Sequence, residues 1–120
     1  RGNENVAGAA DPLDPAVLRL VHYVCAAAAG RVPVSVCGEV AADDAAVPIL
    51  LGLGVDELSV PPYAVPLVKQ AIRALQLGTC RALAQEALAL PSATAVRALV
   101  AGRLDPAADS PNSSMRRRSH

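Results

Sequence analysis

Aromatic residues are nearly missing from this chain of 120 residues, which has two tyrosines and no phenylalanine or tryptophan. Proteins that bind single-stranded nucleic acid stack bases on aromatic side chains, so the composition argues against that class. Net charge is missing as well, because 11 basic residues balance 11 acidic ones. A neutral chain has no overall field that would gather nucleic acid or an anionic membrane surface. We therefore expect neither nucleic acid nor a membrane among its partners.

Long apolar stretches and patterned cysteines are also missing. Uncharged runs such as residues 20–30 and 45–55 fall well short of the roughly 20 residues that a membrane-spanning helix needs. The three cysteines are an odd number without a CxxC pair, which argues against a zinc site or a disulfide framework. We therefore expect reduced thiols in a cytoplasmic protein, and no metal ligands within this chain.

Hydrophobic residues make up 52% of the sequence, so most of the chain can fold around an apolar core. Asp14–Pro15 is a typical helix start, and Gly30 is a typical helix end. A short segment rich in β-branched residues predicts a strand at 32–37, and a second strand is predicted at 57–60, where Pro61-Pro62 stops it. The remaining pattern predicts helices at 15–29, 45–53, 65–75, 79–90 and 91–102.

The order of these elements predicts an α/β fold. A helix between two strands is a βαβ unit, whose strands are parallel by default. Two strands do not form a stable sheet by themselves, so the architecture looks incomplete. The chain also begins with Arg1 rather than Met, and we expect it to be a piece of a longer protein.

Several segments carry a resemblance to a known family. Cys37-Gly38-Glu39 is followed by LLGLGVDELSV and then by VPLVK. This combination resembles the end of the phosphoenolpyruvate-binding barrel of Enzyme I of the bacterial sugar phosphotransferase system, the phosphoenolpyruvate-protein phosphotransferases. The resemblance spans about residues 1–103 and implies the C-terminal part of a TIM (β/α)8 barrel, with about two parallel strands and four to five helices. Residues 104–120 have little to bury and are expected to form a disordered tail.

The resemblance also implies an activity. Family members are transferases that move the phosphoryl group of phosphoenolpyruvate to a histidine of the enzyme, which passes it to a histidine-containing phosphocarrier protein for sugar transport. They use Mg²⁺, whose ligands would precede residue 1, and their barrel domain forms the contact of a homodimer. We expect this chain to be part of such an enzyme. Alone it should be inactive, because phosphoryl transfer depends on positioning groups that the chain does not contain.

Cys37 matches the residue that protonates the enolate of pyruvate in this family. A thiol with a pKa of about 8.5 is mostly protonated at neutral pH, so it can act as a general acid. Arg1 matches an arginine that binds the substrate phosphate. Gly38 fits a tight turn beside the ligand, and Glu39 could orient the thiol. The family motif usually continues with Gly where this chain has Ala42, which puts the geometry of this turn in doubt.

Each of these residues also has a plainer interpretation. Cys37 could be a small buried hydrophobe, as free cysteines usually are. Arg1 could be a solvated terminal side chain, and Glu39 could be an acidic residue at a helix start. Three further residues are expected to serve the fold rather than the chemistry: His22, Cys25 and Cys80.

Two other functions stay open. The chain could be a truncated, catalytically inactive fragment that serves dimerisation or another interaction, since helices without their barrel neighbours expose apolar surface. It could instead be the corresponding part of a pyruvate phosphate dikinase-type enzyme, or a remnant without a function of its own.

Overall fold

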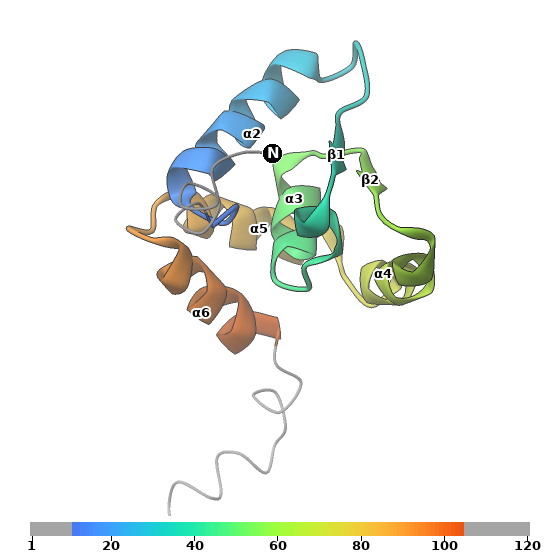
Figure 1. The fold of residues 1–120 in the computed structure, drawn as a ribbon. Coiled ribbons are helices and arrows are strands. Elements are labelled where there is room, and N and C mark those ends of the chain that lie inside the picture. The colour runs from blue at the N-terminus through green and yellow to red at the C-terminus, as the bar shows by residue number, and fades with distance from the viewer. Residues whose placement is uncertain (1–10, 105–120) are drawn as a thin grey trace, which may run out of the picture.

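The computed structural model describes residues 11–104, which form a set of helices with a small parallel sheet at their edge (Figure 1). Along the chain, one long helix is followed by two strand–helix units and then by two closing helices. The elements, with 3-10 helices marked η, are α2 (Pro15–Ala28), β1 (Ser35–Cys37), η1 (Glu39–Ala42), α3 (Ala46–Leu53), β2 (Glu57–Ser59), η2 (Pro62–Ala64), α4 (Val65–Arg73), α5 (Leu77–Leu88) and α6 (Ala93–Leu104).

The sheet contains β1 and β2, which pair in parallel. Ser35 lies opposite Glu57, and Cys37 lies opposite Ser59. The chain passes from β1 to β2 through α3, which confirms the predicted βαβ unit. The α/β class and the number of helices, five α-helices within residues 11–104, are confirmed as well.

β1 is shorter than the strand predicted at 32–37. Pro33 has no backbone N–H to donate. The N–H of Val34 donates to a carboxylate oxygen of Asp56 at 2.8 Å, so a side chain replaces a strand partner there. The regular pairing therefore begins only at Ser35.

The closing helices differ from the prediction at their ends. α5 begins at Leu77, so Gly78 lies inside its first turn instead of breaking the helix. α6 continues to Leu104, one residue into the expected tail. The other predicted tail residues and Arg1 lie outside the described part of the chain. The two 3-10 helices, which end the loops after β1 and β2, are not evident from the sequence pattern.

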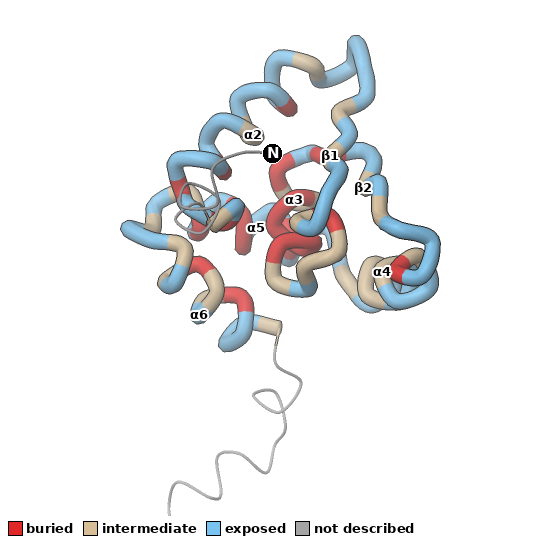
Figure 2. The backbone as a smooth tube through the Cα atoms, viewed as in Figure 1, coloured by how far each residue is buried: buried red, intermediate tan, exposed pale blue. Residues whose placement is uncertain are grey.

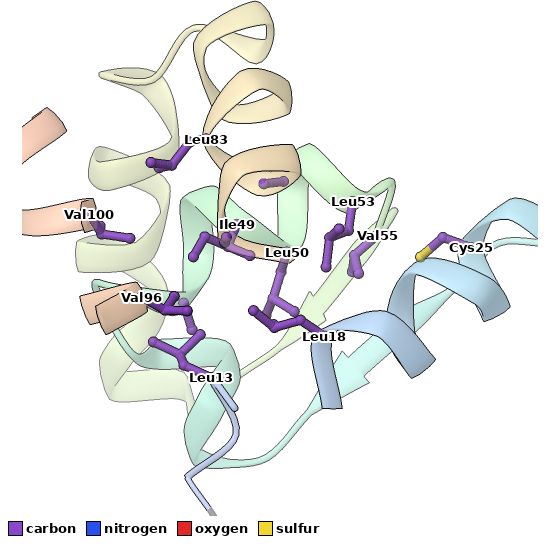
Figure 3. Close-up of a cluster of buried hydrophobic side chains, with 13 residues drawn as sticks. Leu13, Leu18, Cys25, Ile49, Leu50, Leu53, Val55, Leu83, Val96 and Val100 are labelled. Atoms are coloured by element: carbon purple, nitrogen blue, oxygen red, sulfur yellow. The ribbon is translucent and has the colours of Figure 1, made fainter. Parts of the chain in front are cut away.

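The apolar core lies where α2, α3, α5 and α6 meet. α3 is the most buried element, because six of its residues, including Ile49 and Leu50, are buried. Figure 2 shows the buried positions concentrated on α3 and on the facing sides of α5 and α6. Figure 3 shows Leu18, Leu83 and Val96 converging on α3 from three different helices. The first helix of the described chain and its two closing helices are thereby held together around α3.

The two faces of the sheet differ. Val36 and Leu58, the central strand residues, are half-buried and pack against the core. Their neighbours alternate to the opposite face, as successive strand residues do, and are exposed. These four exposed residues are Ser35, Cys37, Glu57 and Ser59. One face of the sheet is thus covered by helices, and the other is open.

α4 lies beside the helical core rather than within it (Figure 1). Val65, Val68 and Ile72 recur at helical spacing and make one apolar face. None of the nine residues of α4 is buried, and Leu67 is 70% exposed. Within residues 11–104, no helix has the length and apolar character needed to cross a membrane.

Candidate active site at the carboxyl ends of the strands

The carboxyl ends of β1 and β2 lie next to each other because the strands run parallel and in register. Each strand ends in a small residue that could take part in chemistry, Cys37 on β1 and Ser59 on β2. Both side chains belong to the open face of the sheet and both residues are exposed. The interpretation of Cys37 as a buried hydrophobe is therefore wrong, since its position at the end of a strand on the uncovered face leaves the thiol accessible.

An open cavity of about 600 Å³ lies at these strand ends. Its walls come from the loop that follows each strand as well as from the strand ends themselves. Two parallel strands that present their carboxyl ends to one cavity form the arrangement in which α/β proteins usually bind ligands. The lining residues are Cys37, Gly38, Glu39, Ala42, Ser59, Val60, Pro61 and Tyr63.

Gly38 turns the chain sharply away from Cys37. Its φ of 96° and ψ of −169° lie in a region that is essentially restricted to glycine. No other atom lies within 4 Å of the position that a Cβ would take there. The backbone conformation, and not a lack of space, therefore demands glycine. The prediction of a turn at Gly38 is confirmed.

η1 follows this turn and forms one wall of the cavity. Glu39 is exposed and lies in the first turn of η1, which fits the plainer interpretation as an acidic residue at a helix start. Ala41 is fully buried and anchors η1 to the core. Ala42 is half-buried and lines the cavity, so a side chain is accommodated where the family motif usually has glycine.

An ionic cluster lies directly after η1. Arg97 of α6 binds both carboxylate oxygens of Asp11, with Nε to Oδ2 and Nη2 to Oδ1 both at 2.9 Å. The same Nη2 donates to Oδ2 of Asp43 at 3.0 Å. The hydrogen bonds from Arg97 hold the pKa of Asp11 below its ordinary value of 3.8. The two carboxylates raise the pKa of Arg97, so the guanidinium stays charged.

The other two cysteines serve the fold, as predicted. Cys25 of α2 and Cys80 of α5 are buried, and burial raises the pKa of both thiols. Both are therefore kept in the protonated, unreactive form. His22 is half-buried on α2, and its Nδ1 has no hydrogen-bond partner among the described residues. It lies near the amino ends of the strands, beside a separate open cavity of about 630 Å³.

Three residues of this region are not evident from the sequence reading. Ser59 could be found from the period-two alternation, because it lies on the same face of β2 as Cys37 does on β1. Tyr63 is 83% exposed at the rim of the cavity, and only the proximity of the two loops places it there. Arg97 has no local signal, since its partners are 54 and 86 residues away along the chain.

The described residues offer no obvious place for a metal ion. Within residues 11–104, no three side chains of His, Cys, Asp or Glu gather as a set of ligands. The Mg²⁺ ligands that the resemblance implies are expected to precede residue 1, so this finding leaves that expectation as a prediction.

Residues 1–77 match the family described as PEP-utilising enzyme, PEP-binding domain. The chain therefore belongs to this family of phosphoenolpyruvate (PEP)-utilising proteins. More particularly, it is similar to PEP-protein phosphotransferases. It is 40% identical over 101 residues to one from Mycoplasma genitalium, and 36% identical over 93 residues to one from Buchnera aphidicola. It is also 38% identical over 101 residues to a multiphosphoryl transfer protein of Escherichia coli. The resemblance seen in the sequence is thereby confirmed.

The relatives are much longer than this chain. The alignments cover 83%, 77% and 83% of the chain for the Mycoplasma, Buchnera and Escherichia proteins, respectively. They cover only 18%, 16% and 12% of those proteins. The chain thus spans less than a fifth of the length of these relatives.

Proposed function

We propose that this chain is the C-terminal part of the PEP-binding barrel of a PEP-protein phosphotransferase, and that Cys37 is its general acid. The observation that carries the proposal is the accessible thiol of Cys37 at the carboxyl end of β1, in a cavity shared with the end of β2. Family membership supports PEP as the substrate. The relatives' names support phosphoryl transfer to a protein.

The proposed step is a proton transfer to carbon. When a histidine of the enzyme attacks phosphorus, the bond between phosphorus and the enol oxygen of PEP breaks, and the oxygen keeps the electron pair. The resulting enolate of pyruvate needs one proton on its methylene carbon. Cys37 donates that proton and becomes a thiolate, and the thiolate takes a proton from water to restore the acid. Pyruvate is then released, and no oxidant or reductant is needed.

The barrel assignment has its own support. In a TIM barrel the residues at the carboxyl ends of the strands carry the chemistry, and helices cover the outside of the sheet. β1 and β2 follow this plan, since helices cover one face and Cys37 and Ser59 lie on the other. The half-exposed apolar face of α4 fits a helix that would cover a further strand of the same barrel. We propose that β1 and β2 are the seventh and eighth strands of that barrel.

The rest of the site is proposed to come from other segments. Arg1 would contribute to binding of the substrate phosphate, because a guanidinium offers two parallel donors to phosphate oxygens. The phosphorylated histidine, the ligands of Mg²⁺ and the surface for the phosphocarrier protein are not assigned to this chain. The chain alone is therefore expected to release no pyruvate from PEP.

A chimera tests the role of Cys37. This chain replaces the corresponding 101-residue segment of the Mycoplasma genitalium relative, and pyruvate release from PEP is measured with a phosphocarrier protein as acceptor. Cys37→Ala should lower the rate by roughly 10²-fold or more, the range typical of a lost general acid. Cys37→Ser should also be slow, because a hydroxyl is a far weaker acid than a thiol.

Cys25→Ala provides the matched control, because Cys25 is buried in the core and lies away from the cavity. It should keep pyruvate release within about threefold, provided that circular dichroism shows an intact fold. Undiminished pyruvate release by the Cys37→Ala chimera would refute the assignment of Cys37 as the acid.

An interaction role is the second candidate, and one observation favours it. Three large apolar side chains that recur at helical spacing on α2 are exposed: Val17 at 38%, Leu20 at 68% and Val24 at 51%. Such residues mark a surface for association when they cluster. Sedimentation of the 120-residue chain separates the two cases, since a monomer at all concentrations would contradict the interaction role.

A further inference from the structure

We propose that Arg97 is a positioning residue for Cys37, an inference that rests on the function proposed above. Arg97 would hold the loop from Gly38 to Asp43, and this loop forms one wall of the cavity that contains the thiol. The family match ends at residue 77, so Arg97 reaches the site from a helix beyond the matched segment.

The geometry of Arg97 fits a role in holding loops. Its guanidinium is shared between two carboxylates, with a two-pronged contact to Asp11 and a 3.0 Å hydrogen bond to Asp43. Each carboxylate is itself fixed by a backbone N–H. Oδ1 of Asp11 accepts from Leu13 at 3.0 Å, and Oδ1 of Asp43 accepts from Ala45 at 3.0 Å. Arg97 therefore links the segment at Asp11 to the loop at Asp43, and each of the two carboxylates also accepts a backbone N–H.

The loop after Cys37 is tied to the core through its apolar side chains and to α6 through Arg97. Gly38 has no side chain, and Glu39 is exposed. Two backbone hydrogen bonds of 3.2 Å close η1, from Ala41 to Gly38 and from Asp43 to Val40. Val40 packs against the core, Ala41 is fully buried, and the carbonyl of Asp43 accepts from the N–H groups of Ala46 and Val47 at the start of α3. The hydrogen bonds from Arg97 add the tie between this turn and α6.

The positive charge of Arg97 also offsets the repulsion between Asp11 and Asp43. Asp11 and Asp43 lie on the same guanidinium, so removal of Arg97 would leave two negative charges close together. Like charges repel, and both side chains are only partly exposed, so water would screen that repulsion incompletely. The side chain of Asp43 would then turn away from Asp11, and the cavity wall formed by Glu39 and Ala42 would lose its tie to α6 and become more mobile.

Arg103 offers a matched control on the same helix. It is 40% exposed, as Arg97 is 39% exposed, and it makes one ion pair of 2.7 Å with Glu86 of α5. Arg103 does not line the cavity at Cys37. Arg97→Gln and Arg103→Gln therefore remove the same charge from α6, and only the first should affect the loop after Cys37.

The first measurement is amide hydrogen exchange of the full 120-residue chain. Arg97→Gln should accelerate exchange at Ala41 and Asp43 by at least tenfold, while the amides of α5 keep their wild-type rates. Arg97→Lys should restore only part of the protection, because an ammonium group cannot bind two carboxylates in the same fork. Arg103→Gln should leave both amides unchanged. A merely structural role would instead raise exchange throughout the core.

Asp43→Asn serves as the second variant if Arg97→Gln does not fold. Asparagine keeps an oxygen that can accept from the N–H of Ala45, but it loses the charge that binds Arg97. It should accelerate exchange at Ala41 at least tenfold while Asp11 keeps Arg97 in place. Unchanged exchange at Ala41 in this variant, or equal acceleration in Arg103→Gln, would overturn the inference.

The second measurement is the kinetics of the chimera described above. Arg97→Gln should lower kcat for pyruvate release at least tenfold with KM for PEP changed less than threefold, because a small displacement of a catalytic group reduces the rate more than binding. An unchanged kcat would overturn the inference. If Cys37 were not the acid, Cys37→Ala would stay active while the exchange result for Arg97 still held, so failures of the two proposals are distinguishable.

Discussion

The close contact between α3 and α5 depends on Gly52, and a Gly52→Ala substitution, which adds one methyl group, tests this dependence. Gly52 of α3 faces α5 so closely that a Cβ would overlap the backbone carbonyl of Cys80 and lie 2.9 Å from Cβ of Ala84. A backbone carbonyl cannot rotate aside as a flexible side chain can. Gly52→Ala must therefore push α3 and α5 apart where they pack against each other.

The expected loss follows from two opposing effects. Overpacking of a well-packed interior usually costs about 1 to 3 kcal/mol, and contact with backbone belongs at the upper end of this range. In the opposite direction, the higher helix propensity of alanine stabilises the folded state by about 1 kcal/mol relative to glycine. The free energy of unfolding should therefore fall by about 2 kcal/mol. For a folded region of this size, that lowers the midpoint of thermal unfolding by about 8 to 16 °C.

Gly102→Ala is the matched control for this experiment. Gly102 also lies in a helix, α6, but no atom is within 4 Å of the position of its Cβ. Only the helix-forming advantage of alanine remains, so this variant should be stabilised by up to about 1 kcal/mol. Thermal and urea unfolding, followed by far-UV circular dichroism on the 120-residue chain, measures both changes. A midpoint for Gly52→Ala equal to or above that of Gly102→Ala would refute the reasoning.

Two further predictions concern the titratable groups. The pKa of Asp11 is lowered in the folded protein by Arg97, so its contribution to stability is present above the ordinary carboxyl pKa of 3.8 and is lost as pH falls below it. The urea midpoint should therefore drop below about pH 4, and Asp11→Asn should flatten that drop. The thiols should react in order of exposure: iodoacetamide at pH 8 should modify Cys37 before Cys25 and Cys80, whose pKa values burial raises. Peptide mass spectrometry would show this order, and equal labelling of all three would contradict it.

Local signals in the sequence predict several elements correctly. Asp14 caps α2 as expected, since its carboxylate accepts from the N–H of Ala16 at 2.8 Å. The strands, the helix between them and the turn at Gly38 follow from equally local preferences. Cys37 could be placed at a strand end for the same reason. A capping residue or a run of β-branched residues influences only the few residues around it, so a short stretch of sequence is enough to predict the element that it forms.

Features that depend on packing were not predictable in this way. Gly78 suggested a break, but α5 runs through it. Gly78 is the second residue of α5, where glycine costs less than the about 1 kcal/mol of a helix interior, and burial of side chains such as Leu83 against α3 outweighs that cost. The pairing of Arg97 with Asp43 and the close approach at Gly52 likewise depend on helices that meet only after folding. Each of these contacts needs residues from two segments that are distant in the sequence, so the pattern of either segment alone does not predict it.

The candidate site lies at the edge of the apolar core. The strands contribute only Val36 and Leu58 to the margin of the core, and the face that carries Cys37 is open. Polar contacts compensate at both ends of β1. At its amino end Asp56 accepts from the N–H of Val34, and beyond its carboxyl end Arg97 binds the carboxylate of Asp43. Because these contacts are directional, they can fix the strand and its following loop without covering the thiol. The apolar side chains of this loop, Val40 and the buried Ala41, lie toward the core and therefore also leave the face of the sheet that carries Cys37 uncovered.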